Sequence, residues 1–276
     1  MAAALQGGLL RFFMFSVTTL QTIDQGNLQN LTEGGASRQT GRVLFTPGLR
    51  PGTPVNVVFY LHGNMFSGFE ALFSRVLASV GAAGKPLAFA MPSLESVPSV
   101  GSWIGTQARF DSFLDGVLLA AAEQINEQAS GKCLVDRDQQ WNGSGPTGNR
   151  VTPATLGNLV IAAHSGGGFP MWTLVNNRSS KLSNLKELWF FDCLYGDMDT
   201  HWISWARANA GINLEIVYTV FPPKETSAKL ARNIGRAAAG RPLIPNVRSV
   251  TQETSNDHNS VPPNNVGRLI RASTNL

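Results

Sequence analysis

Several segments of the chain are almost entirely apolar, and segments with helical periodicity separate them along the sequence. The runs VNVVFYLHG (55–63) and LGNLVIAAHS (156–165) show this most clearly, because each is mainly apolar and ends in polar residues. A strand exposed on one face would alternate apolar and polar residues, so these strands are expected to be covered on both faces. Such strands, alternating with helices, are typical of a parallel α/β sheet. The sequence therefore predicts a mostly parallel central sheet with helices on both faces.

The expected elements continue this alternation to the end of the chain. Two strands come first, at 9–20 and 41–47, and we expect them to form an antiparallel pair within residues 1–50. Further strands are expected at 55–63, 86–93, 156–165, 185–197, 212–222 and 246–255. Helices are expected at 68–84, 108–128, 166–177, 200–211, 225–240 and 261–274. Together these elements predict a sheet of about eight strands.

A long polar insertion at 129–155 separates the helix at 108–128 from the strand at 156–165. A loop of this length in a compact domain is usually functional or flexible. The insertion enters the following strand at its amino end, which favours a position away from the carboxyl ends of the strands. No internal repeat or linker divides the chain, so we expect one domain over residues 1–276.

The composition is typical of a folded globular protein. Of the 276 residues, 43% are hydrophobic and 14% are charged, whereas a disordered chain would be rich in charge and poor in aromatic residues. The formal net charge is +4, and no run of Lys and Arg interleaved with aromatic residues indicates a nucleic-acid partner. No stretch approaches the roughly 18 apolar residues of a membrane-spanning helix. The oligomeric state stays open, and so does the compartment, which is cytoplasmic or, with a signal absent from this chain, secreted.

Metal and redox chemistry are not indicated by the sequence. The histidines lie far apart, no H-E-x-x-H motif is present, and the two cysteines have no spacing that supports a disulfide or a metal site. No metal and no cofactor are therefore expected. The histidines and cysteines of the chain are His62, His164, His201, His258, Cys133 and Cys193.

The segment LGNLVIAAHSGGGFPMW places Ser165 between an apolar strand and three glycines. One interpretation is a tight strand-to-helix turn that needs glycine for backbone reasons alone. Another is a turn that exposes Ser165 as a nucleophile, beside helix N-terminal amides that favour negative charge. A phosphate-binding loop is disfavoured, because neither G-x-G-x-x-G nor G-x-x-x-x-G-K-[ST] is present.

Polar residues stand at the carboxyl ends of the expected strands, the edge at which open α/β sheets bind ligands. After HGNM (62–65), Ser165, Asp192 and His258 follow in the order Ser, Asp, His. This is the order of the α/β-hydrolase family, which the chain resembles from residue 55 to its C-terminus. The family's G-x-S-x-G turn is matched by AHSGG (163–167), where alanine replaces the first glycine but keeps its small size.

This resemblance implies an α/β-hydrolase fold without a large cap domain and a serine hydrolase of the esterase or lipase type. Ser165 would be the nucleophile, His258 the general base and Asp192 the acid that holds the imidazole. Most members carry the acid one strand later, but some, such as platelet-activating-factor acetylhydrolase, resemble this sequence in the earlier position. The alternatives for the acid are Asp197, Asp199 and Glu225.

The same resemblance implies an oxyanion hole that is built from two loops. One donor would be the amide of Gly166, and the other would belong to Asn64 or Met65. Three aromatic residues are candidates for an apolar wall beside an acyl or aromatic group: Phe66, Trp202 and Trp205. The expected substrate is a small-molecule or lipid-like carboxylic ester. An amidase or peptidase with the same three residues, and a non-catalytic ligand-binding relative, are the alternatives.

Overall fold

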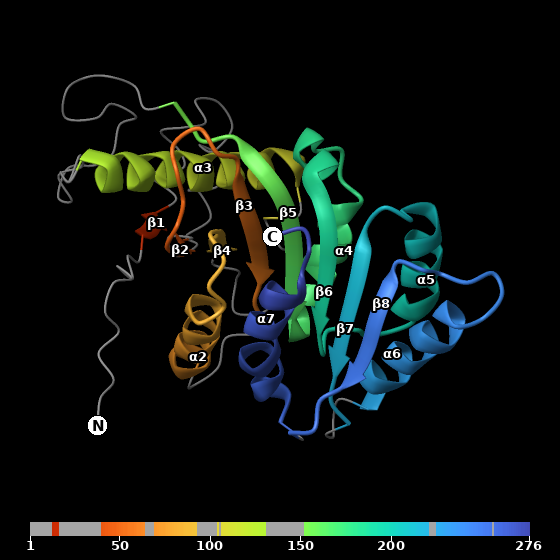
Figure 1. Ribbon diagram of the computed structural model, residues 1–276. Coiled ribbons are helices and arrows are strands. Elements are labelled where there is room, and N and C mark those ends of the chain that lie inside the picture. Colours follow the sequence, from red (N-terminus) through yellow and green to blue (C-terminus); the bar gives the residue numbers. More distant parts are fainter. Residues whose placement is uncertain are drawn as a thin grey trace, which may run out of the picture.

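The computed structural model describes residues 13–16, 40–63, 69–92, 104, 106–130, 152–220, 225–255 and 257–276. Its centre is an eight-stranded sheet in the order β1-β2-β4-β3-β5-β6-β7-β8 (Figure 1). The strands are β1 (Phe13–Ser16), β2 (Thr40–Phe45), β3 (Val55–Leu61), β4 (Ala88–Pro92), β5 (Leu156–His164), β6 (Leu185–Phe191), β7 (Asn213–Tyr218) and β8 (Val247–Gln252).

Most of the sheet is parallel. Neighbouring strands run in the same direction from β4 through β3, β5, β6 and β7 to β8. Strand β2 is antiparallel to both of its neighbours, β1 and β4, so the pair expected near the N-terminus is present. The prediction of a mostly parallel sheet of about eight strands is confirmed.

Helices cover both faces of this sheet (Figure 1). One face carries α2 (Phe69–Gly81) and α7 (Val261–Ala272), and the other carries α3 (Gln107–Ser130), α4 (Gly168–Val175), α5 (Met198–Ala208) and α6 (Glu225–Ala238). In β3, the side chains of Val57 and Phe59 pack under α3, whereas Val58 and Tyr60 pack under α2 and α7. Because side chains alternate between the faces of a strand, burial on both faces explains the uninterrupted apolar run.

The chain leaves β3 and β5 toward opposite faces of the sheet. Strand β3 is followed by α2 on one face, and β5 is followed by α4 on the other. These two strands are neighbours in the sheet. In open α/β sheets, ligands bind at the carboxyl ends of strands where the connections diverge in this way. The predicted site therefore lies at the topological switch point of the fold.

The structure differs from the expected elements at the insertion. Helix α3 continues to Ser130, past its expected end at residue 128, because the alanine at 129 readily extends a helix. Residues 131–151 lie outside the described part of the chain. Where the insertion ends, the backbone N–H of Val55 donates to the carbonyl oxygen of Thr155 over 2.8 Å. This end therefore meets the sheet at the amino edge, opposite to Ser165.

The connection between β6 and β7 contains one helix, α5, and its flanking turns. This length leaves no space for a large cap domain in that connection, as the sequence predicted. Over the described residues, none of the helices has both the length and the apolar character needed to cross a membrane.

Candidate active site

Ser165 stands at the sharp turn between β5 and the helix that follows. Its φ angle is 51°, in the left-handed region that residues other than glycine rarely adopt. A 3-10 turn (Ser165–Gly167) leads from it directly into α4. Backbone conformations of this kind persist only where the surrounding structure imposes them, and they cluster at functional sites. The turn thus presents the serine side chain at the carboxyl edge of the sheet.

Two of the three glycines after Ser165, Gly167 and Gly168, are required by close approaches of the backbone. A methyl group on Gly167 would lie 2.3 Å from the carbonyl oxygen of Leu61, at the end of β3. A methyl group on Gly168 would lie 2.1 Å from the carbonyl oxygen of Cys193, just after β6. The start of α4 therefore packs against the carboxyl ends of β3 and β6, the two strands that flank β5. The backbone packing thus explains why Gly167 and Gly168 are glycines, and the same packing holds Ser165 in its turn.

The loop after β3 begins directly against the serine. A methyl group on Gly63 would lie 2.6 Å from Cβ and 3.2 Å from Oγ of Ser165. Gly166, whose amide is one expected oxyanion donor, is buried in the turn after Ser165. Three predicted residues of the loop after β3 lie outside the described part of the chain: Asn64, Met65 and Phe66.

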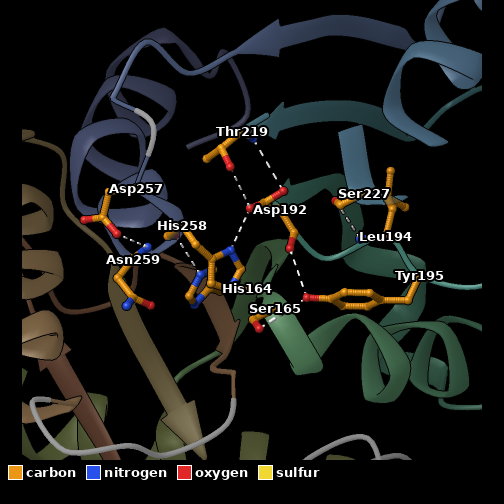
Figure 2. Close-up of polar contacts among 10 residues, drawn as sticks. All are labelled: His164, Ser165, Asp192, Leu194, Tyr195, Thr219, Ser227, Asp257, His258 and Asn259. Carbon is orange, nitrogen blue, oxygen red and sulfur yellow. Dashed lines mark hydrogen bonds and ion pairs between the residues drawn. The ribbon is translucent and has the colours of Figure 1, made fainter. Parts of the chain in front are cut away.

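Asp192 and His258 are joined by a short hydrogen bond. Nδ1 of His258 donates to Oδ2 of Asp192 over 2.6 Å (Figure 2). The Asp192 side chain is fully buried, and an unpaired carboxylate there would be costly. Thr219 supplies two further donors, its backbone N–H at 3.4 Å and its hydroxyl at 3.3 Å. Because Nδ1 donates, Nε2 of the neutral His258 ring is left as a proton acceptor.

The other candidate acids lie elsewhere. Asp197 is exposed just before α5. Asp199, in the first turn of α5, accepts a hydrogen bond of 2.7 Å from an asparagine of α6. Glu225 begins α6, and its side chain is outside the described part of the structure. Among the candidate acids with described side chains, Asp192 is the one that is hydrogen-bonded to His258.

His164, the residue before the serine, contacts His258, and the sequence alone did not indicate this contact. Nε2 of His164 donates to the backbone carbonyl oxygen of His258 over 3.2 Å, and the two ring centroids are 4.5 Å apart (Figure 2). His164 is buried, at 3% exposure. His201, by contrast, is exposed on α5, where its ring lies 5.7 Å from the ring of Trp172.

Tyr195 is a second site residue that the sequence did not single out. Its hydroxyl oxygen lies 3.3 Å from Oγ of Ser165 and donates to the backbone carbonyl of Asp192 over 3.4 Å (Figure 2). The only signal in the sequence was its position close after the acid, in DCLYGD. In the described part of the structure, Ser165 makes its side-chain hydrogen bond with Tyr195 and makes none with His258.

The two tryptophans that were expected to form an apolar wall lie in the core instead. Trp202 is 1% exposed and Trp205 is 8% exposed. The Trp202 ring packs edge-to-face against Phe190 of β6 and against Trp172 of α4, each with centroids 4.8 Å apart. Helix α5 needs this apolar face to pack on the sheet, so the rings are covered by protein. Among the described residues, the aromatic side chain that contacts the serine is Tyr195, and the ring of Phe169 stacks on it.

His62 is buried at the start of the loop after β3 and binds the backbone there. Its Nδ1 donates to the backbone carbonyl of Gly63 over 2.6 Å, and its exposure is 1%. Burial lowers the pKa of His62 from 6.5 to about 4, with the hydrogen bond acting in the opposite direction. The imidazole is therefore neutral near pH 7.

Across the described residues, no group of three or more His, Cys, Asp or Glu side chains is placed to hold a metal ion.

No protein-family model matches the chain, and no curated protein matches it in sequence. Solved structures do resemble it. One is an uncharacterised protein from Capnocytophaga ochracea, with 10% identity and a TM-score of 0.52 over 95% of this chain and 63% of that one. Another is the enterobactin esterase FES from Shigella flexneri, with 8% identity and a TM-score of 0.51 over 97% of this chain and 59% of that one. The chain thus covers less than two thirds of either protein, and at these identities the likeness concerns the fold.

Proposed function

We infer that this chain, which has the α/β-hydrolase fold, hydrolyses carboxylic esters through an acyl-enzyme on Ser165. His258 is the general base, and Asp192 is the acid that orients it. The observation that carries this inference is the 2.6 Å hydrogen bond between Asp192 and Nδ1 of His258, at the sheet edge where a strained turn presents Ser165. An esterase among the proteins that share the fold supports the choice of an ester.

The reaction begins when Oγ of Ser165 attacks the carbonyl carbon of the ester. As the new C–O bond forms, Nε2 of His258 accepts the serine proton and the carbonyl π electrons move onto the oxygen. Asp192 holds the ring in the tautomer that has a free Nε2, and it stabilises the imidazolium that results. When the intermediate collapses, the imidazolium gives its proton to the departing alcohol and the acyl group stays on Ser165. Water then repeats the cycle and releases the carboxylic acid.

Two backbone amides would stabilise the negative oxygen of the tetrahedral intermediate. One is the amide of Gly166, in the turn that starts α4. The other belongs to the loop after Gly63, at Asn64 or Met65. The close approach of Gly63 to Ser165 supports this arrangement, because the loop starts beside the reacting oxygen. The loss of one such donor typically costs about 100- to 1000-fold in turnover.

Tyr195 has to release the serine before attack. Ser165 Oγ is 3.3 Å from the Tyr195 hydroxyl, which in turn donates to the Asp192 carbonyl. With that proton committed, the serine hydroxyl donates to Tyr195 in the resting site. Attack therefore requires rotation of the Ser165 side chain toward Nε2 of His258. Catalytic hydrogen bonds that are loose in a free enzyme commonly tighten when substrate binds.

A fluorophosphonate probe tests this proposal, because it reacts with an activated serine hydroxyl far faster than with an ordinary one. We expect labelling of the native protein, mapped by peptide mass spectrometry to Ser165, and no labelling of Ser165→Ala or His258→Ala. Asp192→Asn retains the shape of the side chain but favours the wrong imidazole tautomer. We expect it to lower the kcat on p-nitrophenyl esters by about 10⁴-fold.

A control variant tests whether the loss of labelling is specific to the histidine of the site. His201→Ala removes an exposed histidine of α5 and should label like the native protein. A folded native protein that is not labelled, or labelling that persists in Ser165→Ala, would refute the proposal. Hydrolysis of the matched p-nitroanilides at rates similar to those of the esters would instead indicate an amidase.

A further inference from the structure

Two aromatic rings beside Ser165 stack on each other. The rings of Phe169 and Tyr195 are parallel to within 1°, and their centroids are 5.9 Å apart. At this separation parallel rings are offset sideways, which is the arrangement that aromatic pairs prefer. The Phe169–Tyr195 pair therefore places two apolar rings, stacked on each other, beside the proposed nucleophile.

The Phe169–Tyr195 pair begins at the nucleophile and becomes more exposed away from it. The Tyr195 hydroxyl lies 3.3 Å from Oγ of Ser165, and the two side chains face each other in Figure 2. Tyr195 is half-buried, whereas Phe169, in the first turn of α4, is 41% exposed. A substrate group attached close to the reacting carbonyl would contact these rings.

The exposure of Phe169 is uncommon in this molecule. Among the large hydrophobic side chains that the structure describes, the exposed ones are Phe169 and Leu243, the latter at 65%. Leu243 precedes β8 and thus lies at the amino edge of the sheet, away from the site. A single exposed apolar side chain usually needs no explanation. The exposed ring of Phe169, however, stacks on the tyrosine beside the nucleophile. Binding of part of the substrate would explain its exposure.

We propose that the Phe169–Tyr195 pair binds an aromatic group of the substrate, so that the enzyme prefers esters with an aryl group close to the scissile bond over alkyl esters of equal size. This inference rests on the proposed ester hydrolysis. The aryl group belongs to either the acyl or the alcohol part, and in both cases its ring lies against the ring of Phe169. The preference arises because stacked rings gain energy beyond that of the apolar area which any group of equal size would bury.

Matched pairs of esters test the preference on each side of the bond. Benzyl acetate is compared with cyclohexylmethyl acetate for the alcohol side, and methyl phenylacetate with methyl cyclohexylacetate for the acyl side. In each pair a methylene separates the ring from the reacting group, so the intrinsic reactivities are similar. We expect the native protein to favour the aryl member of at least one pair in kcat/KM.

The variant Phe169→Leu keeps an apolar side chain but removes the ring. We expect it to lower the aryl-to-alkyl ratio of kcat/KM by about three- to tenfold, the range of measured aromatic pair energies. Phe169→Trp should retain the ratio. Leu243→Ala, which removes the exposed apolar side chain at the far edge, should leave the ratio and the activity unchanged. An equal ratio in the native protein and in Phe169→Leu would overturn the proposal.

Binding to Ser165→Ala separates this proposal from the proposed function. Titration of this variant with benzyl acetate and cyclohexylmethyl acetate, followed by NMR, measures ring recognition without turnover. If the native protein hydrolyses no ester but the variant still prefers the aryl ligand through Phe169, the hydrolase proposal fails and the binding surface stands. If esters are hydrolysed but neither turnover nor binding favours the aryl member of either pair, the binding surface is refuted.

Discussion

Nε2 of His164 donates a hydrogen bond of 3.2 Å to the backbone carbonyl of His258, and the two imidazole rings pack with centroids 4.5 Å apart. This contact links the last residue of β5, directly before the serine, to the 3-10 turn (His258–Ser260) before α7. The proposed general base, His258, and the proposed nucleophile, Ser165, come from segments that are far apart in the sequence. His164 directly precedes Ser165 and binds the backbone of His258. This hydrogen bond therefore fixes the positions of Ser165 and His258 relative to each other.

His164 is therefore predicted to be a positioning residue. His164→Phe retains a ring of similar shape but removes the donor to the His258 carbonyl. We expect kcat on p-nitrophenyl esters to fall about two- to tenfold, the worth of one hydrogen bond, with little change in KM. Steady-state kinetics measure both parameters. His201→Phe, on the exposed face of α5, is the control, and an unchanged kcat in His164→Phe would contradict the prediction.

Tyr195 is predicted to restrain the serine in the resting site. Tyr195→Phe keeps the ring stacked on Phe169 but removes the hydroxyl that lies 3.3 Å from Ser165 Oγ. Because that bond no longer has to break before attack, we expect the second-order rate constant of fluorophosphonate labelling to rise about two- to tenfold. Time-resolved labelling measures this constant. Slower labelling would show that the hydroxyl assists the reaction instead of restraining the nucleophile.

Gly168 is predicted to be indispensable for the packing of α4. In Gly168→Ala the new methyl group would lie 2.1 Å from the carbonyl oxygen of Cys193, so the helix start has to move. We expect the free energy of unfolding to fall by about 1–3 kcal/mol, as is typical of overpacking. Urea denaturation measures the change. Gly211→Ala adds a methyl group with nothing within 4 Å and should change stability by less than about 0.5 kcal/mol. Equal stabilities of the two variants would contradict the close approach.

His62 is predicted to make the stability of the protein depend on pH. Its pKa is about 4 in the folded state and 6.5 when the ring is solvated, because burial disfavours the imidazolium. Between these values the unfolded state binds more protons, so stability increases with pH. The contribution of His62 to the free energy of unfolding is fully present above pH 6.5 and is lost as the pH falls toward 4. It amounts to about 3 kcal/mol.

The variant His62→Asn isolates this contribution, since it keeps a side-chain donor for the Gly63 carbonyl but does not titrate. Free energies of unfolding in urea at about pH 7.5 and about pH 5 give the comparison. The native protein should lose more stability over this range than the variant. Parallel losses in both proteins would show that other groups carry the dependence.

The sequence was sufficient wherever the information was local. The uninterrupted apolar run of β3 predicted burial on both faces, and residues such as Val57 and Val58 do pack into opposite cores. The carboxylate directly after the aromatic run of β6 predicted a buried acid that needs a partner, and Asp192 has that partner in His258. Such statements follow from desolvation and from the two-residue repeat of a strand, which do not depend on what lies across the sheet.

The same reasoning failed for side chains whose role depends on packing between distant segments. Trp202 and Trp205 are aromatic residues close after the acid, but the helix that carries them turns its apolar face to the sheet. Tyr195 and Phe169 carry no pattern that marks them, and they meet only because the loop after β6 and the start of α4 lie side by side.

By itself the sequence determined an α/β chain with a serine, an acid and a histidine in order at the carboxyl ends of its strands, because apolar runs and turn residues act over a few neighbours. The tertiary structure decided which of these groups meet. It paired Asp192 with His258, placed His164 against the same ring and set the Tyr195 hydroxyl on Ser165. Contacts of this kind depend on angstrom-scale approaches such as that of Gly168 to the Cys193 carbonyl, which only the packed sheet and helices define.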